Sequence, residues 1–153
     1  MAVERVCVVC LGNICRSPLG EGVLRQAIMT SGLRIRVDSA GTGGWHAGEA
    51  PDKRSIAEAR RRGVDISRQR ARKWTASDFQ KFDVVLAMDS QNMQDLQALA
   101  RSEEDAAKVK LFLPDGKDVP DPYYGDAKDF AHVYDLVEAA TGYWIEEWLA
   151  DRK

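Results

Sequence analysis

Cysteine, histidine and long apolar runs are all scarce in this chain of 153 residues. Three cysteines are too few, and odd in number, to build a disulfide framework, so we expect a reducing cytoplasmic location. No apolar run approaches the length of a membrane span, and the apolar segment after Met1–Arg5 is too short for a signal peptide. The formal net charge of −2 argues against bulk nucleic-acid binding.

The few cysteines and histidines also argue against a metal site. Cys7 and Cys10 form a Cys-x-x-Cys, but no second such pair follows, and the only histidines are His46 and His132. Residues three apart on a strand point to opposite faces, so Cys7 is interpreted as a small buried hydrophobe. We therefore predict no metal and no cofactor.

Strand and helix patterns alternate along the chain, without repeats or a linker, which predicts a single domain over residues 1–153. The order predicts an α/β fold of three layers: a four-stranded parallel sheet with helices on both faces. In the closing helix, Tyr143, Trp144 and Trp148 are assigned to the core. The predicted strands are 3–9, 33–37, 82–88 and 109–113, and the predicted helices are 19–31, 52–62, 90–100 and 130–148.

The segment over residues 10–17, Cys-Leu-Gly-Asn-Ile-Cys-Arg-Ser, carries the strongest chemical signal. It follows a buried strand and precedes Ser17-Pro18, a predicted N-cap and first helical residue. Unpaired amides and the helix dipole attract anions at such a place and favour a thiolate on Cys10. One loop thus supplies a nucleophile, an anion cradle and the fixed cation of Arg16.

With Pro18 included, this segment resembles the phosphate-binding loop of the low molecular weight protein tyrosine phosphatases. Asp121-Pro122-Tyr123-Tyr124 resembles the general-acid loop of that family, although Asp-Pro alone is also common turn chemistry. The segments 38–42 and 82–89 are similar to further parts of the family. The resemblance covers essentially the whole chain in the expected order.

The resemblance implies that the phosphate-binding loop follows the first strand and carries out the chemistry. Cys10 would attack phosphorus, Arg16 would bind two phosphate oxygens, and Asp121 would protonate the leaving group and then activate water. The phosphate-binding residues would be Leu11, Gly12, Asn13, Ile14, Cys15, Arg16 and Ser17, through their backbone amides and the Arg16 side chain.

The resemblance also implies supporting roles. Asn13, Ser17 and Ser39 would organise the loop, with Ser17 donating to the Cys10 thiolate. Cys15 would be a redox partner of Cys10, or a packed small residue. Bacterial relatives often carry histidine where Gln69 falls, a departure that bears on one supporting hydrogen bond but not on the mechanism. The phosphotyrosine ring would enter a slot walled by Leu11, Trp45, Tyr123 and Tyr124, which could instead cap the core edge.

These features predict a phosphotyrosine phosphatase that also cleaves small aryl phosphates and acts on tyrosine-phosphorylated proteins. A protein-arginine phosphatase would carry threonine at the position of Ile14. A thioredoxin-coupled arsenate reductase needs later cysteines, and none follows Cys15. A non-catalytic phosphate-binding module would need neither Cys10 nor Asp121. No nucleic-acid or membrane partner is expected, and a monomer is assumed.

Overall fold

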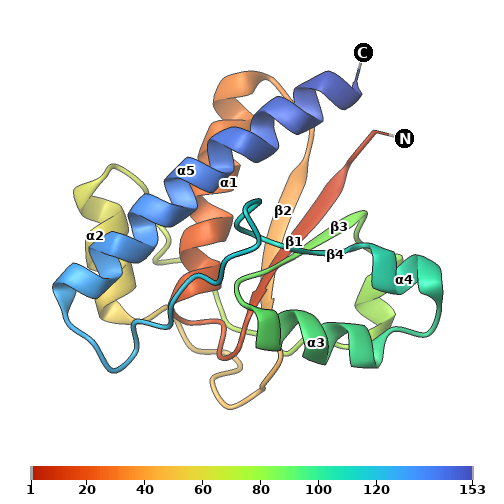
Figure 1. Cartoon of the computed structure of the whole chain (residues 1–153). Helices are drawn as coiled ribbons and strands as arrows, with labels where there is room; N and C mark the ends of the chain where they lie inside the picture. The colour runs from red at the N-terminus through yellow and green to blue at the C-terminus, as the bar shows by residue number, and fades with distance from the viewer. Residues whose placement is uncertain (1, 153) are drawn as a thin grey trace.

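Short segments rich in β-branched residues form the centre of the molecule. The computed structural model describes residues 2–152 and contains a parallel sheet of four strands in the order β2-β1-β3-β4 (Figure 1). β1 pairs with β2 from Arg5↔Arg36 to Cys10↔Gly41, so Cys10 ends a central strand. The strands are β1 (Arg5–Cys10), β2 (Arg36–Gly41), β3 (Val84–Ala87) and β4 (Val109–Leu111).

Helices cover both faces of this sheet, as predicted (Figure 1). Alternate residues of β1 belong to two hydrophobic cores. Val6, Val8 and Cys10 lie in the core on one face of the sheet, and Cys7 and Val9 lie in the core on the other face. The opposite placement of the two cysteines is therefore confirmed. The first side holds α1 (Arg16–Ser31), α2 (Lys53–Arg61) and α5 (Ala127–Asp151); the second holds η1 (Ala76–Gln80), α3 (Ser90–Leu99) and α4 (Glu103–Ala107).

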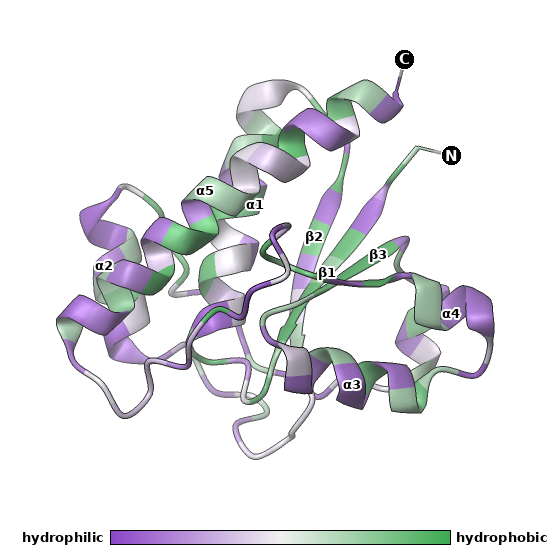
Figure 2. Ribbon diagram, in the orientation of Figure 1, coloured by the Kyte–Doolittle hydropathy of each residue, from purple (hydrophilic) through white to green (hydrophobic). Residues whose placement is uncertain are grey.

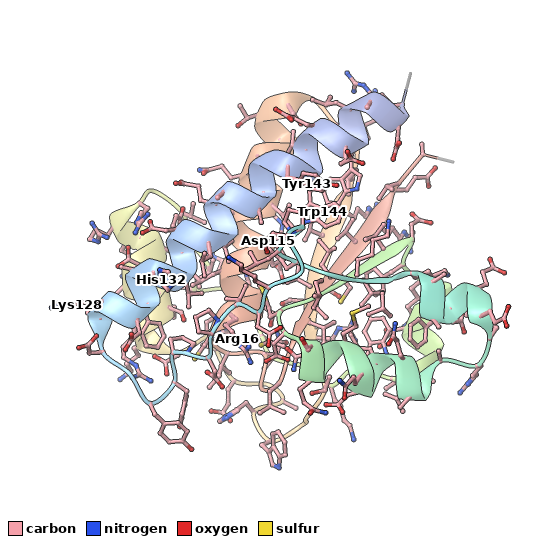
Figure 3. The ribbon with its side chains drawn as sticks, viewed as in Figure 1. Arg16, Asp115, Lys128, His132, Tyr143 and Trp144 are labelled. Carbon is pink, nitrogen blue, oxygen red and sulfur yellow. The ribbon has the colours of Figure 1, made fainter. Side chains whose placement is uncertain are left out.

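The closing helix α5 packs against α1 and α2 and adds side chains to the core on that face of the sheet, and its polar and apolar residues alternate in bands (Figure 2). Trp144 and Trp148 are buried, and Trp144 Nε1 donates to the Phe112 carbonyl at 2.8 Å. Tyr143, labelled beside Trp144 in Figure 3, is 42% exposed. The assignment of Tyr143 to the core was therefore wrong, because the helical turn carries it away from the sheet.

The second strand lies further along the chain than predicted. Leu33 and Ile35 pack against the core, but pairing with β1 begins only at Arg36 and continues to Gly41. The apolar alternation in 33–37 marks residues that pack against the core, whereas the limits of the strand are set by its backbone pairing with β1. The other strands are within two residues of prediction at each end, and η1 and α4, too short for a periodic signal, were not predicted.

The first helix begins at Arg16, so the predicted N-cap role of Ser17 is wrong. Cys15 occupies the cap position without a capping side-chain hydrogen bond, and the Ser17 hydroxyl contacts Cys10 instead. Gly32 ends the helix in the left-handed region with φ 78°, as predicted. No helix within residues 2–152 is both long enough and apolar enough to cross a membrane.

Candidate active site

Neighbouring segments hold the loop from Cys10 to Arg16 in place through hydrogen bonds to its outward-facing carbonyl groups. The Cys10 and Leu11 carbonyls accept from the Thr42 and Gly43 amides, each at 2.9 Å. On the other side, the Ile14 carbonyl accepts from the Asp52 amide at 2.8 Å, and the Cys15 carbonyl accepts from Ser55 Oγ at 3.2 Å. Neighbouring segments from β2 and α2 thus hold both halves of the loop.

With the carbonyls turned outward, the loop amides are available on the inside. The Asn13 amide donates to Cys10 Sγ at 3.3 Å. Within residues 2–152, the amides of Gly12, Ile14 and Cys15 donate to no protein atom. Asn13 makes this turn possible, since it has φ 58°, a region that asparagine tolerates better than most residues. The result is an anion cradle centred near the sulfur of Cys10.

A buried hydrogen-bond network fixes which way the Ser17 hydroxyl points. Asn13 Oδ1 accepts from the Arg72 amide at 3.0 Å, so its Nδ2 must face the two serines. This nitrogen donates to Ser17 Oγ at 2.8 Å and to Ser39 Oγ at 3.0 Å. Ser17 is then left to donate its own proton to Cys10 Sγ, 3.0 Å away. The Cys10 sulfur thus accepts from the Ser17 hydroxyl as well as from the Asn13 amide.

The network continues to a buried carboxylate that the sequence analysis missed. Ser39 Oγ donates to Glu21 Oε1 at 2.7 Å, and Glu21 pairs with Arg25 at 2.7 Å. Burial raises the pKa of Glu21, and the contacts from Ser39 and Arg25 oppose this effect without cancelling it. Glu21 follows Ser17 by four residues on α1, so helical spacing after the loop was a usable signal.

One edge of the Arg16 guanidinium group is held by protein acceptors, and the other edge faces the cavity. Its side chain is 3% exposed and lies at the loop end of the sheet (Figure 3). Nη1 donates to Asp89 Oδ2 at 2.7 Å and to the Val119 carbonyl at 3.0 Å. Burial lowers the pKa of Arg16, but Cys10, Asp89 and Asp121 outweigh that effect, and the pKa is raised. Nε and Nη2 keep donors for an anion, while Asp89, at the carboxyl end of β3, orients the guanidinium.

Asp121 lies across the same cavity from the loop. Its Oδ2 is 3.8 Å from Arg16 Nη2, its Oδ1 accepts from the Tyr123 amide at 3.1 Å, and its side chain is 46% exposed. The cavity measures about 260 Å³, and the predicted slot residues Leu11, Trp45, Tyr123 and Tyr124 all line it. Cys10, Gly12, Ile14, Cys15, Arg16, His46 and Asp121 line it as well.

His46 is a further residue of the cavity that sequence reasoning did not assign. Its ring lies next to Gly12, where an added Cβ would come within 3.2 Å of His46 Cδ2, and Nδ1 lies 3.0 Å from Glu49 Oε2. Its proximity in sequence to Trp45 was the available signal. No cluster of metal-ligating side chains occurs within the described part of the chain.

The three thiols have different surroundings. All three are free, and burial raises the pKa of Cys15 to about 12, with Asp52 adding to the effect. Burial also raises the pKa of Cys7 well above its ordinary value, on the other side of the sheet. Cys15 therefore holds its proton at neutral pH, whereas Cys10 alone receives the Ser17 and Asn13 hydrogen bonds.

Gln69 retains a supporting contact at the position where histidine was expected. Its Nε2 donates to the Pro18 carbonyl at 3.1 Å, which ties the 64–72 segment to the first turn of α1. Gln69 Oε1 is buried without a protein partner. Gln69 therefore connects this segment to the helix that follows the loop.

A thiol inside an amide cradle, with an arginine and a carboxylate facing it at the end of a parallel sheet, is an arrangement suited to binding a phosphate group. The family model "Low molecular weight phosphotyrosine protein phosphatase" matches residues 5–153. The chain belongs to this family and is a phosphatase.

Comparisons with individual proteins point to the same family. The chain is 44% identical over 146 residues to a low molecular weight protein-tyrosine-phosphatase of Streptomyces coelicolor, covering 90% of this chain and 88% of the relative. It superposes with a TM-score of 0.92 on a protein tyrosine phosphatase from Entamoeba histolytica, at 33% identity and 98% and 99% coverage. Vibrio vulnificus Wzb, solved in complex with benzylphosphonate, gives 0.87 at 31% identity, with 95% and 99% coverage.

Proposed function

We propose that this phosphatase hydrolyses phosphotyrosine through a phosphocysteine at Cys10. The observation that carries the proposal is the cradle: loop carbonyls face outward, free amides face inward, and Ser17 Oγ lies 3.0 Å from the sulfur. Such donors stabilise the charge on the equatorial oxygens as phosphorus is transferred. The free edge of Arg16 binds two of these oxygens, a geometry that lysine does not reproduce.

Asp121 acts as the general acid and then as the general base. In the first step, sulfur attacks phosphorus, the phosphorus–oxygen bond to the phenol breaks, and Asp121 protonates the leaving oxygen. In the second step, the Asp121 carboxylate takes a proton from water, which attacks phosphorus and releases Cys10 as a thiolate. Its position in the cavity beside Arg16 supports this role. Asp118 is turned instead toward Ser90, with contacts at 2.7 and 2.9 Å.

An aryl phosphate suits this cavity better than the alternatives considered. Aromatic and apolar side chains, those of the slot residues, form part of its wall, and Ile14 stands at the position where a polar contact to phosphoarginine is expected. The benzylphosphonate in the Vibrio vulnificus relative carries the same combination of aromatic ring and phosphorus group. An arsenate reductase would need further cysteines, and this chain has none after Cys15. A module that only binds phosphate would not need Asp121.

Turnover of p-nitrophenyl phosphate in the presence of a chelator tests the reaction. Activity is expected to survive the chelator and to disappear in Cys10→Ser. Asp121→Ala should hydrolyse phosphotyrosine roughly 10²–10⁴-fold more slowly, with Asp118→Ala as the matched control. Full activity of Cys10→Ser would refute the nucleophile, and a larger loss in the control would transfer the acid role to Asp118. Phosphoarginine peptides turned over faster than phosphotyrosine peptides would refute the substrate class.

We further propose that Cys15 protects Cys10 from permanent oxidation in a reducing, cytoplasmic setting. Peroxide converts the Cys10 thiolate to a sulfenic acid, and the Cys15 sulfur displaces water to form a disulfide. The raised pKa of Cys15 keeps it from competing as the first target. Peroxide-treated wild type should regain activity with added thiol, while Cys15→Ala should not. Equal recovery by both proteins would contradict the role.

A further inference from the structure

Exposed apolar side chains gather at one end of this molecule. Of the seven large apolar side chains that are exposed within residues 2–152, two, Met29 and Tyr143, lie elsewhere. The other five line the active-site cavity or a groove beside it: Leu11, Trp45, Leu99, Tyr123 and Tyr124. A concentration of this kind marks a binding surface rather than the ordinary scatter of apolar residues.

The groove beside the cavity, here called the side groove, lies between the loop that follows β2 and the end of α3. It measures about 480 Å³, and the residues that carry its chemistry are Leu11, Trp45, Lys73, Asp95, Ala98 and Leu99. Leu11 and Trp45 also line the active-site cavity, so these two side chains separate one hollow from the other. The side groove therefore continues directly from the place where phosphotyrosine binds.

The wall between the two hollows is built from the backbone upward. The Trp45 ring lies directly over Gly43, where no Cβ could fit beneath it, and the ring remains 71% exposed. Gly44 lies against the stem of Lys73, where an added Cβ would make a tight contact, 3.2 Å from Lys73 Cδ. Two glycines thus hold one apolar ring and one apolar stem at the rim.

On the opposite side, α3 presents Ala98 and Leu99, and Leu99 is 44% exposed. The Asp95 carboxylate accepts from Gln91 Nε2 at 2.9 Å. Lys73 forms no ion pair with any residue in 2–152. The side groove therefore combines the apolar side chains of Leu11, Trp45, Ala98 and Leu99 with two charged ones, a composition that suits an apolar side chain next to polar groups.

We propose that the side groove is a specificity site for a large apolar residue close to phosphotyrosine in the protein substrate. The inference rests on the proposed function, since it places phosphotyrosine in the neighbouring cavity. An extended peptide advances about 3.3 Å per residue, so a residue within three positions of phosphotyrosine reaches past Trp45. Continuity with the active-site cavity favours this occupant over a second copy of the chain.

A leucine scan of phosphopeptides tests the proposal. The substrates are alanine-rich phosphotyrosine peptides with a single leucine at each position from three before to three after the phosphotyrosine. At one of these positions, leucine should raise the kcat/KM of the wild type roughly 10-fold over the all-alanine peptide. Leu99→Ser should abolish most of that gain, while its activity on p-nitrophenyl phosphate and the all-alanine peptide stays within about twofold. Met29→Ser, the same kind of change at an exposed apolar residue outside the groove, should keep the gain.

Three results would overturn the proposal: no leucine position gives a gain, Leu99→Ser reduces all substrates equally, or Met29→Ser loses the gain as well. Sedimentation velocity addresses the second copy: a dimer that Leu99→Ser dissociates, without any leucine preference, assigns the groove to self-association. If the wild type failed on p-nitrophenyl phosphate, the proposed function itself would fail. Binding of the same peptides, measured by fluorescence anisotropy, would then test separately whether the side groove takes a leucine side chain.

Discussion

Asp89→Asn isolates the orientation of Arg16 from the rest of the site. Asp89 accepts from two groups: its Oδ1 receives the Asn92 amide at 2.7 Å at the start of α3, and its Oδ2 receives Arg16 Nη1 at 2.7 Å. Asparagine keeps the first contact through its own Oδ1 and remains a good N-cap. It replaces Oδ2 with an NH₂ group, which faces the arginine donor and cannot accept from it. Helix α3 should therefore persist while Arg16 loses its main anchor.

The magnitude follows from the burial of the pair. A hydrogen bond between charged groups contributes about 1.5–3 kcal/mol, and the Asp89 side chain is 21% exposed, which places the loss in the lower part of that range. Misaligned donors should then lower kcat roughly 10- to 100-fold. Removing a negative charge also leaves Arg16 more available to the phosphate dianion, which opposes any weakening of substrate binding. We therefore expect kcat to fall much more than KM rises.

Steady-state hydrolysis of p-nitrophenyl phosphate measures both constants, and Asp118→Asn is the matched control. Asp118 contacts the start of the same helix through Ser90, and its substitution removes one negative charge nearby without touching Arg16. The control should keep kcat within about twofold of the wild type. An unchanged kcat in Asp89→Asn, or an equal loss in the control, would refute the orienting role.

Two further predictions concern stability. The pKa of Glu21 is raised in the folded state, so folded protein binds this proton more readily and stability falls as pH rises from the ordinary carboxyl range through the folded pKa. Thermal unfolding should show the Tm of Glu21→Gln gaining on the wild type as pH rises above the ordinary carboxyl range; a constant difference would contradict the assignment. In α1, an added Cβ at Gly20 would come within 2.8 Å of Met88 Cε and 2.9 Å of Val8 Cγ1, whereas Gly142 in α5 has open space. Gly20→Ala should therefore destabilise the protein by about 1–3 kcal/mol and Gly142→Ala should stabilise it by about 0.5–1 kcal/mol in chemical denaturation; stabilisation by both would refute the close packing of Gly20.

The sequence predicted most of the fold because the strongest local patterns agree with the tertiary structure. The run around β1 and the helical spacing of α5 indicated the central strand and the closing helix. β2 was misplaced because its limits depend on pairing with a strand far away in sequence, which Leu33 and Ile35 do not report. Tyr143 was misassigned for a related reason: in an aromatic-rich helix, small differences in angle decide which rings are covered.

The site was predicted as a set of residues, but its organisation was not. Local sequence placed Cys10 beside a helix start, yet the orientation of Ser17 depends on the Arg72 amide acting through Asn13. Asp89 and the Val119 carbonyl hold Arg16 across separations of 73 and 103 residues. Contacts over such distances follow from the sheet order, in which the carboxyl ends of parallel strands meet at one edge.

The central claim is that Cys10 carries the phosphoryl group during the reaction. On the proposed mechanism, Asp121→Ala should slow hydrolysis of the intermediate but still accept p-nitrophenyl phosphate, whose leaving group needs little protonation, so the intermediate should accumulate. Rapid quenching followed by peptide mass spectrometry should find one phosphoryl group on the peptide that contains Cys10, and none in Asp121→Ala/Cys10→Ser. A phosphoryl group on any other residue, or turnover with no modified protein, would contradict the account.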